Sequence, residues 1–150
     1  MPKLDLESIP QSNATGYPPP YNEAVQERWV RRLSAACGLT DLGAAHVVLK
    51  PGAWSSQRHW HAEEDELVIV ISGEAVLVED DGETVMRAGD IAAWPKNVRN
   101  GHVLQNRSDG DCVLLGVSAG DSKADWGEYP DIDMKFVRAT GFTRKDGTPF

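Results

Sequence analysis

Three histidines and one glutamate are spaced along this chain so that they could bind one metal ion. His59 and His61 flank Trp60, and residues two apart in a strand project to the same face. Glu66 opens the β-branched run Glu-Leu-Val-Ile-Val-Ile, which is typical of a strand. His102 follows a glycine and begins another short apolar run. Three imidazoles and a carboxylate suit divalent Fe, Mn, Ni, Co or Zn, and they leave one or two positions open for substrate or water.

Two glycine-containing motifs enclose these four residues. The first runs, in order, Gly52, six residues, His59-Trp60-His61, four residues, Glu66, six residues and Gly73. The second runs Gly89, five residues, Pro95, five residues, Gly101, His102, three residues and Asn106. In this order the pair resembles the two signatures of the cupin superfamily, whose members form jelly-roll barrels. The resemblance implies that one divalent metal ion is bound by His59, His61, Glu66 and His102.

The second motif departs from the usual cupin pattern, which is Pro-x-Gly-x-x-His. Asn97 and Asn100 hold the glycine and histidine positions of that pattern. The first motif also has six residues between its glycine and the histidine pair, where five are usual. His102 comes two residues late but keeps the usual four-residue step to Asn106. We therefore assign His102 as the fourth ligand and keep Asn100 as the alternative.

The residues around both motifs are similar to those of small single-domain bacterial cupins that are often labelled sugar-phosphate-isomerase-like. The resemblance implies a metal-dependent enzyme that acts on a small polar or anionic molecule. Fold alone is a weak guide to chemistry, so two other functions stay open: a non-catalytic cupin that binds or senses a small ligand, and a cupin dioxygenase. A structural role with a vestigial site is a further alternative. No residue stands out as the base that an isomerase needs, and the catalytic residues stay unassigned.

Residues in or beside the motifs are candidates for binding the substrate. Five of them are predicted to shape its pocket: Gln57, Arg58, Trp94, Asn100 and Asn106. Four basic residues lie in the same stretches: Arg58, Lys96, Arg99 and Arg107. These basic side chains either attract an anionic substrate or are solvated charges at the rim of the barrel.

Length and composition indicate one domain with a core of its own. The chain has 150 residues, 41% of them hydrophobic, and no apolar run approaches the roughly 18 residues of a membrane span. The net charge of −8 argues against nucleic acid as a partner, because phosphate backbones are bound by basic surfaces. The first residues are neither basic nor apolar, so we expect no secretory signal and a cytoplasmic location. Cys37 and Cys112 are expected to be reduced thiols without a catalytic role.

Turn residues divide most of the chain into short strands, which predicts an all-β, single-domain jelly-roll barrel. Strands are expected over residues 44–50, 66–72, 75–79, 83–86, 91–94, 102–106 and 112–118. The barrel core is expected to span residues 44–118, after an N-terminal extension, 1–43, that contains one short helix. Residues 22–36 are the candidate for this helix, since Val25, Trp29 and Leu33 recur at a four-residue step and Gly38 could end it.

The last part of the chain, residues 119–150, is polar and rich in turns. Its scattered apolar residues include Trp126, Tyr129 and Phe136. Such a tail cannot form a core alone, so we expect it to pack on the barrel or on the second subunit of a homodimer. A lid over the mouth of the barrel is the alternative.

Overall fold

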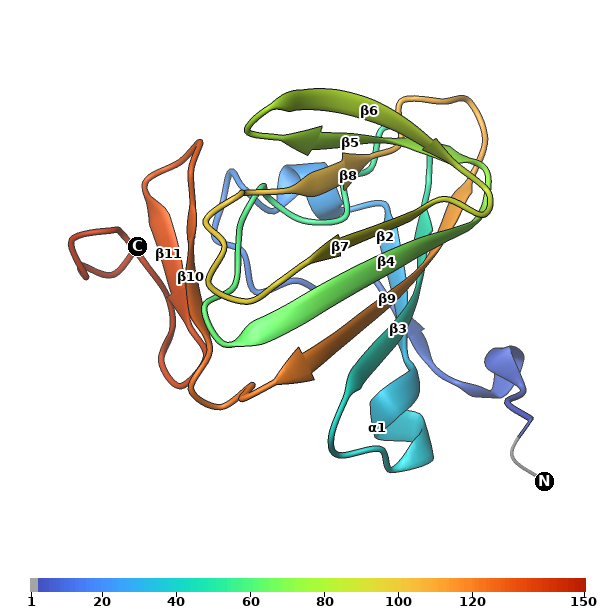
Figure 1. The fold of residues 1–150 in the computed structure, drawn as a ribbon, viewed down its shortest axis with the longest axis horizontal. Coiled ribbons are helices and arrows are strands. Elements are labelled where there is room, and N and C mark those ends of the chain that lie inside the picture. Colours follow the sequence, from blue (N-terminus) through green and yellow to red (C-terminus); the bar gives the residue numbers. More distant parts are fainter. Residues whose placement is uncertain (1–2) are drawn as a thin grey trace.

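Strands dominate the structure, a computed structural model that describes residues 3–150 (Figure 1). The larger sheet has the spatial order β1 (Gln11–Ser12), β2 (Arg28–Arg32), β3 (Gly43–Leu49), β9 (Cys112–Gly120), β4 (Glu64–Ser72) and β7 (Ile91–Trp94). The smaller sheet has the order β6 (Gly82–Arg87), β5 (Glu74–Glu79) and β8 (Val103–Gln105). All pairings within the two sheets are antiparallel. The helical elements are α1 (Leu33–Cys37) and two 3-10 turns, Leu6–Ser8 and Glu23–Val25.

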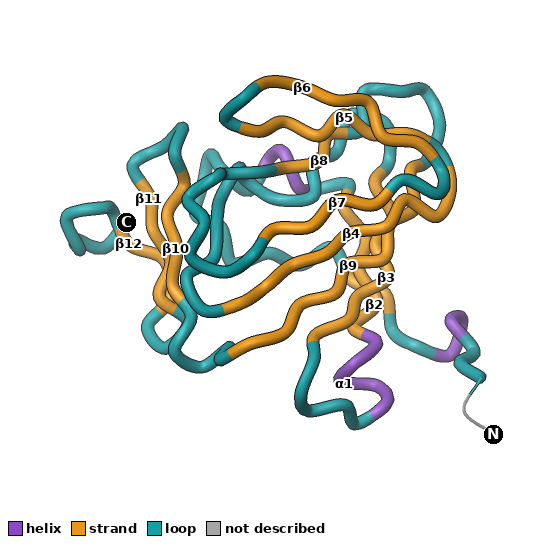
Figure 2. Tube along the Cα trace, in the orientation of Figure 1, coloured by secondary structure: helices purple, strands orange, loops and turns teal. Residues whose placement is uncertain are grey.

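The two sheets face each other (Figure 2), and buried side chains from both form the main hydrophobic core. Val68 and Val70 on β4 point inward, while the next residue, Ile71, is 49% exposed, because successive side chains of a strand alternate between its faces. The inward valines belong to the same buried cluster as Leu77 of β5 and Leu104 of β8. This packing confirms the predicted all-β fold class and leaves the concave face of the larger sheet to line the interior.

All seven predicted strands are present, with limits that differ from the prediction by at most two residues. The turn between β4 and β5 shows why its glycine is needed. Gly73 has a φ of 76°, and a side chain there would overlap the backbone of Asp111. Only glycine adopts that conformation without strain and leaves this space free.

The helix predicted over residues 22–36 is wrong. The segment instead forms a 3-10 turn, Glu23–Val25, then β2, and only then the five-residue helix α1, which ends at Gly38 with a φ of 70°. Strand β2 pairs with β3, with Trp29 opposite Val48, so long-range backbone hydrogen bonds override the local helical pattern. Among residues 3–150, no helix is long and apolar enough to cross a membrane.

The last residues hold more regular structure than the sequence suggested. A third sheet joins β10 (Trp126–Tyr129), β11 (Met134–Val137) and β12 (Gly141–Thr143), and it stands at one end of the two main sheets (Figure 1). Its small core of Tyr129, Met134 and Phe136 is completed by residues that include Tyr17 of the N-terminal segment. The two ends of the chain therefore share one cluster beside the larger fold.

Candidate metal centre

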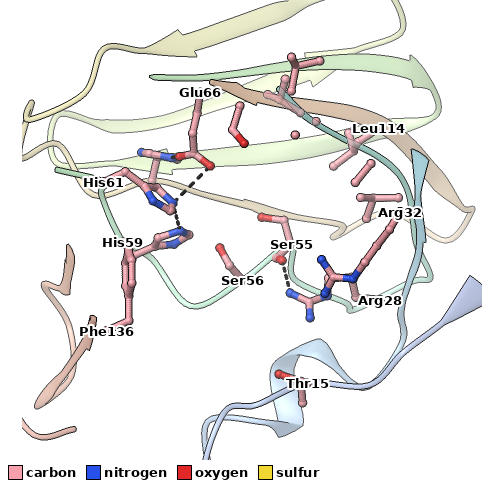
Figure 3. A pocket seen from close by; sticks show the side chains of 18 of the residues that line it. Thr15, Arg28, Arg32, Ser55, Ser56, His59, His61, Glu66, Leu114 and Phe136 are labelled. Carbon is pink, nitrogen blue, oxygen red and sulfur yellow. Dashed lines mark hydrogen bonds and ion pairs between the residues drawn. The ribbon is translucent and has the colours of Figure 1, made fainter. Parts of the chain in front are cut away.

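His59 and His61 lie on the connection between β3 and β4, and their imidazoles lie side by side near Glu66 (Figure 3). Backbone hydrogen bonds pair His59 with His102, with N to O distances of 3.3 and 2.9 Å. Trp60 is buried and packs instead against Trp126, with ring centroids 5.1 Å apart. The alternation of side chains thus separates the tryptophan from the two histidines, as the spacing predicted.

The four predicted ligands lie close together. Nε2 of His59 is 3.0 Å from Nε2 of His61, which is 3.4 Å from Oε1 of Glu66. Nε2 of His102 is 2.7 Å from the other carboxylate oxygen of Glu66. Ligand atoms about 2.1 Å from one ion are about 3.0 Å apart at a right angle and about 3.4 Å at the tetrahedral angle. The spacing of His59, His61 and Glu66 therefore fits one ion, and His102 adjoins them through Glu66.

Hydrogen bonds on the far side of each ring determine which nitrogen faces the centre. Nδ1 of His59 and Nδ1 of His102 donate to the backbone carbonyl oxygens two residues before each ring, at 2.8 and 3.0 Å. Nδ1 of His61 donates to the carboxylate of Asp125 at 2.6 Å. Carbonyl and carboxylate oxygens only accept hydrogen bonds, so each neutral ring presents the lone pair of Nε2 to the centre.

These lone pairs face other acceptors. Nε2 of His59 faces Nε2 of His61, and Nε2 of His102 faces the carboxylate of Glu66. Two acceptors at hydrogen-bond distance repel each other unless a cation or proton lies between them. A divalent ion bound by all four groups would remove that repulsion, so the chemistry of the set fits a metal.

The charges around the centre also suit a cation. In the metal-free protein, protons on the rings can take the place of the ion: burial by itself would raise the pKa of Glu66, but a hydrogen bond donated by His102 and the charges of His59 and His61 in their protonated forms lower it to about 2. Burial lowers the pKa of His61, yet its hydrogen bond to Asp125 and the charge of Glu66 outweigh burial, and the pKa is raised. Glu66 is therefore ionised at neutral pH, as a metal ligand must be.

A second acidic cluster shares one of these rings. His61 offers Nδ1, on the opposite side of its ring, to Asp125 at 2.6 Å and to Glu64 at 3.7 Å. Both carboxylates already have a positive partner, because Arg138 lies 3.0 Å from Glu64 and 3.6 Å from Asp125. The Nε2 side of His61 is therefore the better candidate position for an ion, and Asp125 would orient the ring.

Comparisons with known proteins identify the family. A profile of the cupin domain matches residues 45–118. A crystal structure from Silicibacter pomeroyi, named a sugar phosphate isomerase from a cupin superfamily, is 44% identical to this chain. The two superpose with a TM-score of 0.92 over 99% of this chain and 96% of that chain. The chain belongs to the cupin superfamily.

Two further solved structures resemble this cupin less closely. A protein from Acidithiobacillus ferrooxidans, named provisionally as a sugar phosphate isomerase, is 26% identical, with a TM-score of 0.71 over 77% of this chain and 74% of that chain. The polyketide cyclase RemF from Streptomyces resistomycificus is 18% identical, with a TM-score of 0.64 over 79% of each chain, and shares the fold. No curated protein matches this cupin.

The candidate ligands line a cavity of about 700 Å³ (Figure 3). This volume lies within the range of about 300–1,000 Å³ that is usual for small-molecule sites. Other parts of the wall come from β2, the connection after β3, the N-terminal segment and the C-terminal sheet, and include Tyr17, Arg28, Arg32, Ser55, Ser56, Tyr129 and Phe136. The cavity of this cupin is thus completed by segments outside the matched domain.

Two tyrosine hydroxyls on this wall were not expected from the sequence. Tyr17 and Tyr129 are 112 residues apart, yet their hydroxyl oxygens lie 3.4 Å from each other. Burial raises the pKa of both, so both keep their protons at neutral pH. Tyr129 donates its proton to the hydroxyl of Tyr17, which leaves the proton of Tyr17 for a ligand. No local pattern links such distant residues, and their pairing follows from the packing of the C-terminal sheet on the N-terminal segment.

The structure places one of the five predicted pocket residues on the cavity wall. Trp94 stacks on His102, with ring centroids 3.8 Å apart and planes 6° apart, and lines the cavity. Gln57 does not, because its amide donates to the carbonyl of Tyr21. Arg58 is also held outside the wall, in ion pairs with two aspartates.

Asn100 and Asn106 do not reach the cavity either. The amide of Asn100 donates to Glu79 at 2.9 Å, away from the metal centre, while the backbone carbonyl of Asn100 supports His102. Asn106 is 0% exposed, and its amide donates to the carbonyls of Leu49 and Gly110. Asn100 precedes His102 in the motif and Asn106 follows it, and both side chains hydrogen-bond to other parts of the protein instead of lining the cavity.

Three of the four basic residues near the motifs have partners away from the cavity. Arg107 pairs with Glu83 at 2.7 Å, and the guanidinium of Arg99 lies 5.1 Å from the ring centroid of Trp60. The cavity wall lacks all four basic residues named from the motifs: Arg58, Lys96, Arg99 and Arg107. Arg28 and Arg32 line it instead. A strand over Arg-Trp-Val-Arg-Arg would have placed these two on one face, and the predicted helix obscured that signal.

Replacing Asp125 with asparagine is expected to weaken metal binding roughly 10- to 100-fold, because outer partners of a ligating histidine have that effect. Asp125 is 0% exposed and anchors Nδ1 of His61. Isothermal titration calorimetry with Zn(II) and Mn(II) measures the change. The control is Asp109→Asn, which alters an exposed loop. Equal affinities in the two variants would contradict the role of Asp125.

The metal-free protein is expected to lose stability in acid through His59. Burial, the largest influence, lowers the pKa of His59 from 6.5 to about 4. The unfolded chain then binds this proton more readily than the folded chain, so the free energy of unfolding falls as pH drops from 6.5 towards 4. His59→Gln should reduce the loss by on the order of 2 kcal/mol. Urea unfolding of EDTA-treated protein across this range tests it, and an unchanged pH slope in the variant would contradict it.

Proposed function

We propose that this cupin is a metal-dependent enzyme that acts on a small polar or anionic molecule, with sugar phosphate isomerisation as the first reaction to test. The observation that carries the proposal is the set of four inward acceptors, His59, His61, Glu66 and His102, whose mutual repulsion a cation would remove. Each of the three rings is oriented by a hydrogen bond on its far side. The name of the 44% identical protein from Silicibacter pomeroyi supports the reaction class.

Some residues of the cavity wall would bind the ion, and others would contact the substrate. A bound divalent ion would supply Lewis acidity toward a carbonyl or a pair of hydroxyls. The hydroxyl of Tyr17, which accepts from Tyr129, can donate its own proton to a substrate oxygen on the same wall. Trp94 and Phe136 add apolar surface that excludes water from the bound substrate.

A second candidate function is a cupin that binds a small ligand without converting it. Among residues 3–150, Glu66 is the only carboxylate on the cavity wall, and it belongs to the proposed ligand set. A proton-transfer reaction needs a base near the substrate carbon. If no residue on the wall acts as this base, the cavity binds its ligand and releases it unchanged.

One series of measurements separates these functions. The metal content of protein purified without added metal is determined first, and the loaded protein is then assayed with sugar phosphates, keto acids and catechols, with oxygen uptake recorded for the last. Turnover that Glu66→Gln abolishes supports the enzyme. A ligand that raises the melting temperature without turnover supports the binder. Protein that takes up no Mn(II), Ni(II), Fe(II), Co(II) or Zn(II) at neutral pH overturns the metal-dependent enzyme.

The predicted homodimer and cytoplasmic location belong to the same proposal. A small-molecule substrate and no nucleic acid partner are expected, because the net charge of the chain is −8. Light scattering of the purified protein would measure its oligomeric state directly, and a single-subunit mass would contradict the homodimer.

A further inference from the structure

Two arginines face the cavity from β2, opposite the proposed metal ligands. Figure 3 shows Arg28 and Arg32 on one side of the cavity and His59, His61 and Glu66 on the other. Residues 28 and 32 lie four apart in one strand, so their side chains leave the same face of the sheet. The cavity therefore has one positively charged end that the metal centre does not use.

Neither arginine has an anionic partner in the part of the chain that the structure describes. No ion pair within residues 3–150 includes Arg28 or Arg32, in contrast to Arg31 between them, which pairs with Glu7 at 3.1 Å. Nη1 of Arg28 donates to the carbonyl of Ser55 at 2.7 Å. Its Nε is buried without an acceptor. An unpaired donor on a partly buried guanidinium costs free energy unless a ligand supplies the acceptor.

The two guanidinium groups also repel each other. Burial is the main cause that lowers the pKa of Arg28, and the like charge of Arg32 lowers it further. Holding two such charges beside one cavity is unfavourable in the absence of a counter-charge. A ligand group with two negative charges and several acceptor oxygens offsets both costs. A phosphate monoester has these properties, with a charge of about −1.5 to −2 at neutral pH and three acceptor oxygens.

The floor between the two ends of the cavity is built from small residues. Arg32 lies opposite Ala45, Ala45 lies opposite Gly116, and Gly116 lies opposite Val68, across β2, β3, β9 and β4. A side-chain carbon at Gly116 would meet nothing within 4 Å. Three strand spacings separate β2 from β4, about 14 Å between backbones. The arginine side chains cover part of that distance, and open space remains for the rest of the ligand.

We propose that Arg28 and Arg32 form the subsite for the phosphate group of a phosphorylated substrate, whose polar end meets the metal ligands across Gly116. The inference rests on the proposed function for the nature of the polar end. The phosphate subsite stands by itself, since its charges and its unpaired donor do not depend on the ion. In this proposal the anion is recognised by Arg28 and Arg32, and not by the arginines near the motifs.

The test starts with metal-free protein, so that phosphate cannot bind to a metal ion. Inorganic phosphate is titrated into EDTA-treated protein and followed by calorimetry and by ³¹P NMR line width. Saturable binding is expected, and Arg28→Met or Arg32→Met should weaken it by roughly tenfold or more, since each removes charge-assisted hydrogen bonds. Arg31→Met is the matched control in the same strand, and it should leave the affinity unchanged.

Further variants separate this subsite from the metal centre. Glu66→Gln should lose metal binding yet keep phosphate binding, which supports the subsite even if the enzyme proposal fails. Gly116→Val should keep both inorganic phosphate and metal but exclude fructose 6-phosphate, because the new side chain fills the floor. Arg32→Lys should retain part of the affinity. Phosphate binding that is absent from the folded wild type, or equal in wild type and both arginine variants, overturns the inference while leaving the metal proposal intact.

Discussion

Glu66→Gln is expected to lower the affinity for a divalent metal by more than about a hundredfold, since even outer partners of metal ligands contribute about 10- to 100-fold. The change keeps the shape of the side chain and removes its charge. Glu66 lies 3.4 Å from Nε2 of His61 and 2.7 Å from Nε2 of His102, and its pKa of about 2 keeps it ionised. The affinity is measured by calorimetry, and the bound metal by elemental analysis.

The neighbouring carboxylate provides the control for this experiment. Asp65 is exposed and accepts a hydrogen bond from the backbone of Lys96, so Asp65→Asn should leave metal affinity unchanged. A parallel pair decides between the two candidates for the fourth ligand. His102→Ala should weaken metal binding, whereas Asn100→Ala should not, because the amide of Asn100 is directed to Glu79. Tight metal binding by Glu66→Gln would show that the ion lies elsewhere.

Gly127→Ala is expected to lower the free energy of unfolding by about 3 kcal/mol, at the upper end of the cost of forcing extra atoms into a packed site. A side-chain carbon at Gly127 would overlap the backbone carbonyl oxygen of Trp60, which cannot move away as a flexible side chain can. Strand β10 must then separate from the segment that carries the two histidines. The hydrogen bond from Ala62 to Trp126 joins these two segments, and Asp125 lies beside it.

Gly116→Ala is the matched control, because a methyl group there meets open space. It should change stability by less than about 1 kcal/mol in either direction. Urea unfolding of the metal-free proteins measures both variants. We also expect Gly127→Ala to weaken metal binding, since it displaces the strand that follows Asp125. Equal stability of the two alanine variants would show that the C-terminal sheet does not depend on this close approach.

The candidate ligands were accessible from the sequence because their geometry is mainly local. Two residues two apart in an extended segment share a face, which brings His59 and His61 together without knowledge of the fold. Glu66 and His102 came from the order of two motifs, and the structure brings both to the same centre. Asp125, which orients His61, could not be predicted in this way, because it is 64 residues from His61 and no motif includes it.

The end of the cavity that carries the two arginines was not predictable in the same way. Arg28 and Arg32 sit in a segment whose apolar residues recur at a helical step, yet β3 offers this segment a ladder of backbone hydrogen bonds. Whether such a segment becomes helix or strand depends on that partner, which is distant in sequence. The arginines near the motifs were candidates for binding an anionic substrate only because they lie close to the motifs in the sequence. In the fold, nearby carboxylates form ion pairs with two of them.

The sequence by itself determined the all-β architecture, the seven central strands and the residues of the candidate metal centre. Alternation, turn residues and motif spacing act over a few residues, so they can be read along the chain. Only the tertiary structure decided what surrounds that centre: Asp125 behind His61, the tyrosine pair, and two arginines opposite the ligands. These groups meet through the packing of β2 and the C-terminal sheet, which depends on long-range complementarity of surfaces rather than on any local pattern.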